Sequence, residues 1–366
     1  MRKHWIDYLR WATVLLVLFY HVIYFYNNKG VVGGIGGFGD GPQYQDVVMY
    51  ILYPWFMPLL FILAGVSARY ALKKRTGKEW FNERTRKLLV PSTIGLLFFG
   101  VFIGWINSKI AADPALEFLP APVKFAIWVI SGTGPLWFIQ DLWILSLLLL
   151  LVRKLDAKEK FYNFCSKAGI VPLILMGVLF WLGHQTLVMN PDPAGIGGLL
   201  NLYKPLFYAI PFFMGYFIFA HDNVQDMLGR YWIPLLVCAS VAGIVLIMTT
   251  FGQDISLPQY LSSPMNNIYG WLMCLAMMAW FKACFDRTGK FADYMTRSSY
   301  GMYIVHYLII ASVGMYLKVE THLPPVCIYM ILTVAVFVLS PFLYEVLRRI
   351  PFLRWCILGE KRHISK

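Results

Sequence analysis

Long apolar runs constrain this chain more than any other feature of its sequence. Ten of them could each cross about 30 Å of hydrocarbon as an α-helix, and a composition of 59% hydrophobic residues excludes a soluble globular domain. The expected spans are residues 9–27, 47–68, 88–108, 127–152, 170–189, 205–220, 231–250, 265–281, 299–317 and 326–347. The sequence therefore predicts an all-α polytopic membrane protein, with about ten transmembrane helices in one domain over residues 1–366.

The basic residues are divided unevenly between the two ends of these spans. With the N-terminus placed inside, 27 of the 32 lysines and arginines fall on that side. The remaining five are Lys29, Lys109, Lys124, Lys204 and Lys318. This is the positive-inside pattern, so we expect both termini in the cytoplasm. The net charge of +13 is then explained by the basic cytoplasmic loops and their attraction to anionic lipid. No nucleic-acid partner is expected.

The first apolar run, residues 4–28, is too long and too bulky at its end to be a cleavable signal. Arg10 and His21 lie eleven residues apart, nearly a whole number of helical turns. Their side chains should therefore share one face, about 16 Å apart along the axis. Asp7 precedes Arg10 by three residues and could orient its guanidinium. A histidine deep in a span indicates a polar cavity, although a hydrogen bond to a neighbouring helix is an alternative role.

Two other spans carry polar residues at informative depths. His306, in "RSSYGMYIVHYLII", lies at nearly the depth of His21, so both helices could line one chamber, or His306 could be a structural pairing. Asp141, in "GPLWFIQDLWIL", lies below the outer surface, where it could pair with a neighbouring helix or contact an acceptor. The six cysteines form no close pair and no metal-ligand spacing, so neither a disulfide nor a metal site is expected.

Several motifs together resemble the membrane acyltransferase 3 family. They are "IDYLRWATVLLVLFYH", "MPLLFILAGVSAR", "RTRKLLVP", "GPLWFIQDLWIL" and "SSYGMYIVH", in this order along the chain. The ending "YEVLRRIPFLRW" is similar to the branch that contains glucan and polysaccharide succinyl- or acetyltransferases. One departure is "LAGVSA", where many members have a serine-glycine pair, and it weakens any role assigned to Ser67 or Gly65.

The resemblance implies a stand-alone O-acyltransferase in a bacterial inner membrane. Such an enzyme moves an acetyl or succinyl group from cytoplasmic acyl-CoA to a hydroxyl of an extracytoplasmic glycan or similar acceptor, without a metal. On this hypothesis neutral His21 is a general base, with a transient acyl-histidine as the competing mechanism. The thioester oxygen needs a hydrogen-bond donor, for which the candidates are His306, Tyr300 and Tyr303.

The remaining site residues follow from the expected position of each ligand. The basic segment between residues 69 and 87 could hold the phosphates of CoA, or could serve only retention and lipid contact. The expected cofactor-binding residues are Arg10, Arg69, Arg84, Arg86 and Tyr300. The expected acceptor-binding residues are Trp137, Asp141 and Tyr24. A transporter or flippase of a glycan or lipid-linked substrate remains the alternative, because broken helices and buried polar residues also suit alternating access.

Overall fold

The computed structural model describes residues 3–28, 34–39, 41–112, 114–187, 205–255 and 257–360. All regular structure within these ranges is helical, which confirms the predicted all-α class. The helices are α1 (His4–Phe25), α2 (Val47–Leu52), α3 (Phe56–Leu72), α4 (Gly77–Arg84), α5 (Gly100–Ala111), α6 (Ala121–Ser131), α7 (Trp137–Leu155), α8 (Lys160–Cys165), α9 (Ile170–Leu175), α10 (Gly177–Thr186), α12 (Pro205–Phe217), α13 (Asp222–Arg230), α14 (Trp232–Thr250), α15 (Pro258–Ser262), α16 (Pro264–Cys284), α17 (Lys290–Glu320), α18 (Pro325–Arg349) and α19 (Pro351–Leu358). Lys29 and Lys204 lie outside the described residues.

Several of these helices are long and apolar enough to cross a membrane, so the chain is a multi-pass membrane protein. Among the described residues there are six such segments: His4–Phe25, Tyr44–Leu72, Gly134–Leu155, Trp232–Thr250, Lys290–Glu320 and Pro325–Arg349. Shorter apolar helices cover Ala121–Ser131, Ile170–Thr186 and Leu206–Phe217. The count of ten spans and the cytoplasmic placement of the termini therefore stay predictions.

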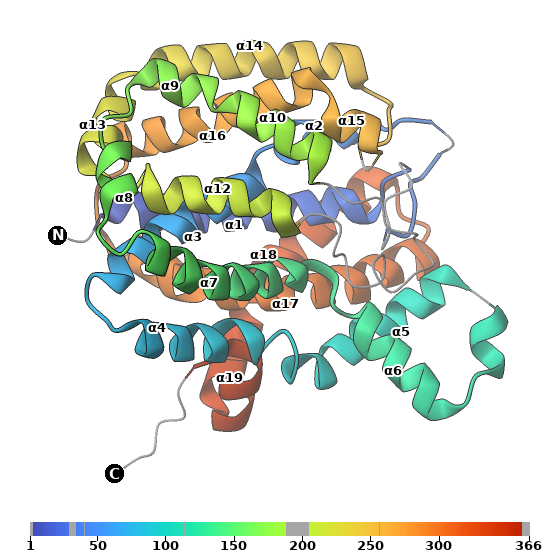
Figure 1. Ribbon diagram of the computed structural model, residues 1–366. Helices are drawn as coiled ribbons and strands as arrows, with labels where there is room; N and C mark the ends of the chain where they lie inside the picture. Colours follow the sequence, from blue (N-terminus) through green and yellow to red (C-terminus); the bar gives the residue numbers. More distant parts are fainter. Residues whose placement is uncertain are drawn as a thin grey trace.

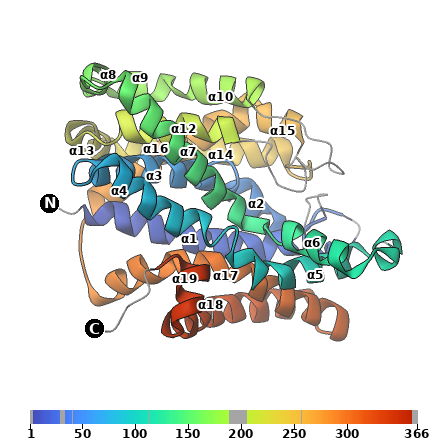
Figure 2. The same cartoon turned by 60° about the horizontal axis from the view of Figure 1, so that its bottom comes forward.

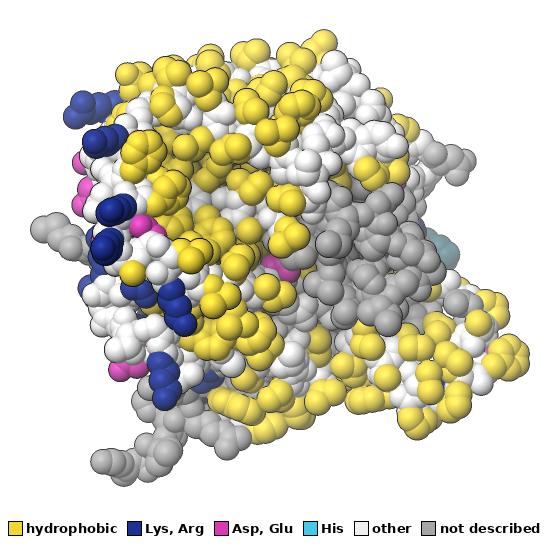
Figure 3. Space-filling view, in the orientation of Figure 1, with side chains coloured by type: hydrophobic (Ala, Val, Ile, Leu, Met, Phe, Trp, Pro, Cys, Tyr) yellow, Lys and Arg dark blue, Asp and Glu magenta, His cyan; other side chains and the backbone are white. Residues whose placement is uncertain are grey.

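Helix α1 runs through the middle of the bundle. It packs against α17 and α18 on one side and against α3 and α16 on the other (Figures 1 and 2). The α5–α6 pair projects at the end of the bundle away from the start of α1 (Figure 1). Lysine and arginine side chains gather at the end where α1 begins (Figure 3), and we call it the basic end. Residues on α1 are thus surrounded by helices from both halves of the chain.

Two glycines let α3 and α12 approach closely. A Cβ on Gly65 would overlap the carbonyl oxygen of Phe212, and a Cβ on Gly215 would overlap that of Ile62. Small residues at such a crossing allow backbones to pack in van der Waals contact, which drives helix association in lipid. Gly65 therefore has a packing role, although the departure of its motif from the family pattern weakened any role expected for it.

Prolines interrupt two of the expected spans. Helix α2 ends at Leu52 and α3 begins at Phe56, so the break surrounds Pro54. The expected span over 88–108 is not one helix either, because a π-helical turn (Thr85–Leu89) and a turn around Pro91 precede α5. Proline lacks an N–H and clashes with the preceding turn, which explains both interruptions.

Candidate functional site

The structure brings His21 of α1 and His306 of α17 into contact. Nδ1 of His21 lies 2.8 Å from the carbonyl oxygen of Val17 and 3.3 Å from Nε2 of His306. Nδ1 of His306 lies 2.5 Å from the carbonyl oxygen of Tyr303. The His306 side chain is fully buried and that of His21 is half-buried. The matching depths in the sequence therefore correspond to a direct contact between the rings.

These contacts assign the protons on the two imidazoles. A carbonyl oxygen only accepts hydrogen bonds, so each histidine carries its proton on Nδ1. Nε2 of His306 then accepts the second, longer branch of the bond that His21 donates. Nε2 of His21 is left with the lone pair of a neutral imidazole, which is the form that accepts a proton. The His21 ring is edge-on to Tyr24 and Tyr307, with ring centroids 5.7 and 5.6 Å away.

The three candidate donors for a thioester oxygen are all engaged elsewhere in this structure. Tyr300 donates to the carbonyl oxygen of Lys87, and Tyr303 donates to that of Pro135. The ring nitrogens of His306 are occupied by the Tyr303 carbonyl and by His21. His306 is thus placed to orient His21, and a role as oxyanion donor would require it to change partners.

Arg10 lies toward the basic end of α1 and is held from two sides. It donates to Asp7 at 3.2 Å, as the three-residue spacing suggests, and to the hydroxyl of Ser67 at 2.6 Å. Ser67 was not expected to have a role, since its motif departs from the family pattern. Two effects lower the pKa of Arg84 to about 10. The larger is burial of its guanidinium, and the next is repulsion by the positive charge of Arg10. Two guanidiniums held near one another favour an anionic ligand.

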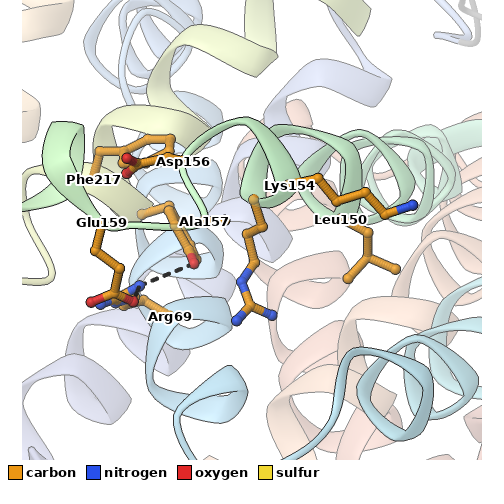
Figure 4. A pocket seen from close by; sticks show the side chains of 9 residues that line it. Arg69, Leu150, Lys154, Asp156, Ala157, Glu159 and Phe217 are labelled. Carbon is orange, nitrogen blue, oxygen red and sulfur yellow. Dashed lines mark hydrogen bonds and ion pairs between the residues drawn. The ribbon is translucent and has the colours of Figure 1, made fainter.

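The other two arginines that are expected to contact phosphate have protein partners in this structure. Arg86 donates from Nε to the carbonyl oxygen of Gly359 at 3.1 Å, at the end of α19. Arg69 is two positions after Ser67, so it emerges from nearly the opposite face of α3. It pairs with Glu159 at 2.9 Å, and its guanidinium stacks 3.5 Å from the ring centre of Tyr162. It lines a pocket to which neither Arg10 nor Arg84 contributes (Figure 4).

The residues that are expected to bind the acceptor lie on two helices, Tyr24 on α1 and both Trp137 and Asp141 on α7. Tyr24 lies beside His21. Trp137 instead packs its ring against Tyr208, with centroids 5.1 Å apart. Asp141 is 3% exposed, and no lysine or arginine among the described residues lies within ion-pair distance of it. Within the same residues, no group of three or more histidine, cysteine or carboxylate side chains could hold a metal.

Comparison with known proteins identifies the family. A family model described as "Acyltransferase domain" matches residues 3–345, which run from the start of α1 almost to the end of α18. Searches of the curated proteins and of the solved structures each returned no match. Because the family match covers nearly the whole chain, and the sequence motifs agree with it, this protein belongs to the membrane acyltransferase 3 family.

Proposed function

We propose that this protein is an acyl-CoA-dependent O-acyltransferase of the bacterial inner membrane. It takes an acetyl or succinyl group from acyl-CoA on the basic, cytoplasmic side and places it on a hydroxyl of an extracytoplasmic glycan or similar acceptor. The observation that carries the proposal is the pair of contacts at Nδ1 of His21. The Val17 carbonyl fixes the proton on this atom, His306 accepts the longer branch of the same bond, and Nε2 is left as a base. A base held in one tautomer by a second group is the arrangement that acyl transfer uses.

The proposed reaction needs one proton acceptor in the membrane. Nε2 of His21 takes the proton of the acceptor hydroxyl while its oxygen attacks the thioester carbonyl. The carbon–sulfur bond then breaks, and the imidazolium returns the proton to the departing CoA thiolate. His306 accepts a hydrogen bond from His21 throughout, and this bond strengthens when His21 becomes positively charged. The products are an acyl ester and free CoA.

Arg10 and Arg84 suit the phosphates of the donor. Both lie toward the basic end, and the mutual repulsion of their guanidiniums is relieved when an anion binds between them. Arg10 is on the same face of α1 as His21, about three turns below it. A donor held there by its phosphates could extend its thioester arm along α1 toward His21, while Tyr24, Trp137 and Asp141 would serve the acceptor.

The first test is a donor assay on the purified wild-type protein in detergent. Radiolabelled acetyl-CoA and succinyl-CoA are incubated separately, with and without candidate glycans, and both CoA release and label transfer are measured. We expect CoA release that depends on an acceptor. Label retained on the denatured protein without acceptor would instead favour an acyl-histidine intermediate. A folded preparation that neither releases CoA nor transfers label would contradict the enzymatic proposal and favour the transporter or flippase alternative.

A further inference from the structure

A polar pocket lies at the basic end, and neither His21 nor His306 lines it. It has a volume of about 340 Å³ and is formed by α3, the end of α7, the turn that follows α7, and α12 (Figure 4). Its polar lining residues are Arg69, Arg153, Lys154, Asp156, Glu159 and Tyr216. Such a volume lies at the lower end of the range that small-molecule sites occupy.

Arg69 forms the floor of this pocket. Its side chain is 7% exposed, and its guanidinium donates to the hydroxyl of Tyr216 at 3.2 Å and stacks on the ring of Tyr162. Its Nε atom is buried and has no hydrogen-bond partner among the described residues. A buried guanidinium normally has all its donors satisfied, so this arginine is held by fewer hydrogen bonds than its burial requires.

The other charges around the pocket also favour an anion. Arg153 lines the pocket, and in the described part of the chain it forms no ion pair. Figure 4 shows the ammonium of Lys154 pointing away from Arg69. The carboxylate of Asp156 is already used, because it accepts hydrogen bonds from the backbone N–H groups of Phe161 and Tyr162. Glu159 is therefore the carboxylate that neutralises Arg69.

Glu159 reaches Arg69 from an unusual backbone conformation. Its φ of 54° and ψ of 25° are left-handed, a region that non-glycine residues seldom adopt without a specific reason. Its carboxylate contacts Arg69 at 2.9 Å, yet its side chain remains 48% exposed. The contact is made by a short turn between α7 and α8, which lines the pocket. Rotation of the Glu159 side chain alone could move the carboxylate away, without breaking the hydrogen bond that the Glu159 carbonyl accepts from Asn163 of α8.

We propose that the Arg69 pocket is a binding site for a phosphate or pyrophosphate group, and that Glu159 occupies it as an internal competitor until such a ligand displaces it. The carboxylate supplies the same two-oxygen face to the guanidinium that a phosphate supplies. Ligand binding therefore exchanges one anion on Arg69 for another and brings Arg153 into contact with it. The phosphate can belong to the acyl donor or to a free polyphosphate, and both present the same chemistry to the pocket. This site stands independently of the catalytic role proposed for His21.

The test compares ligand affinity in wild-type protein and Glu159→Gln. The Glu159 carboxylate of this pair is half-exposed, and an ion pair open to solvent contributes up to about 1 kcal/mol, which corresponds to about fivefold in a dissociation constant. Removing the competitor should therefore lower the dissociation constant by about fivefold. Titration calorimetry on the full chain in detergent is run separately with CoA, 3′-dephospho-CoA and inorganic pyrophosphate. Tightening for CoA assigns the site to the acyl donor, and tightening for pyrophosphate alone assigns it to another ligand.

A matched control separates competition from a general change in charge. Asp226→Asn removes a carboxylate from the Asp226–Lys282 pair, which has the same 2.9 Å separation but does not line the pocket. It should leave all three affinities unchanged. A second variant, Arg153→Gln, should weaken binding of the ligand that Glu159→Gln tightens. The proposal is overturned if Glu159→Gln tightens none of the three ligands, or if Asp226→Asn tightens them equally.

Discussion

Replacing His306 separates its proposed role from that of His21. His306→Leu removes the acceptor 3.3 Å from Nδ1 of His21 but leaves the Val17 carbonyl at 2.8 Å, so the proton on His21 stays in place. The bond to His306 is long and weak while His21 is neutral, and it becomes charge-assisted when His21 takes a proton. Hydrogen bonds to charged groups contribute about 1.5 to 3 kcal/mol, so kcat should fall about 10- to 100-fold.

Because the lost interaction strengthens in the transition state, kcat should fall while the KM for acyl-CoA changes little. The assay is steady-state CoA release by the purified variant, with circular dichroism and melting temperature as checks on folding. His306→Gln is the matched control, because its side-chain oxygen can accept the bond and should restore part of kcat. A folded His306→Leu protein with wild-type kcat would refute the coupling. Complete inactivity in both folded variants would show that His306 takes part in the chemistry itself.

Two further predictions concern packing and donor binding. Gly65→Ala places a methyl group against the Phe212 carbonyl and should lower the free energy of unfolding by about 1 to 3 kcal/mol, whereas Gly289→Ala has open space around its Cβ. Equal melting temperatures of these two variants would contradict the close α3–α12 crossing. Burial and Arg10 lower the pKa of Arg84 to about 10, so the wild-type guanidinium stays charged between about pH 7 and 9. In Arg84→Lys the same surroundings act on an ammonium of ordinary pKa about 10.4, so CoA affinity should weaken as pH rises through this range. A variant whose affinity is independent of pH would contradict donor binding at Arg84.

Helical geometry and membrane depth explain what could be predicted from the sequence. The period of 3.6 residues placed Arg10 and Asp7 together, and the length of each apolar run placed His21 and His306 at one depth. Their meeting at 3.3 Å depends on which helices are neighbours, and no single-span pattern contains that information. The family motifs favoured an acyltransferase over a transporter, because several of them occur together and in order along the chain.

The phosphate contacts show where prediction from the sequence stopped. The sequence grouped Arg10, Arg69, Arg84 and Arg86, yet only Arg10 and Arg84 are placed near one another by their interaction. Arg69 pairs with Glu159, and Arg86 donates to the Gly359 carbonyl. The contact of Arg69 with Glu159 joins residues 90 positions apart (159 minus 69) through a left-handed turn. Tertiary packing decides such contacts, and local propensity does not report them. Ser67 was missed for a different reason, since the departure of its motif from the family pattern concealed its contact with Arg10.

The central claim is that Nε2 of His21 accepts the proton of the acceptor hydroxyl. The most direct measurement is acyl transfer by purified His21→Ala, beside His184→Ala, which removes a buried imidazole that pairs with Asn267 and, within the described residues, forms no hydrogen bond with His21 or His306. Both proteins are first shown to be inserted and folded. The account predicts that His21→Ala loses acyl transfer while still binding CoA, and that His184→Ala retains transfer. Wild-type rates of transfer from folded His21→Ala would contradict it.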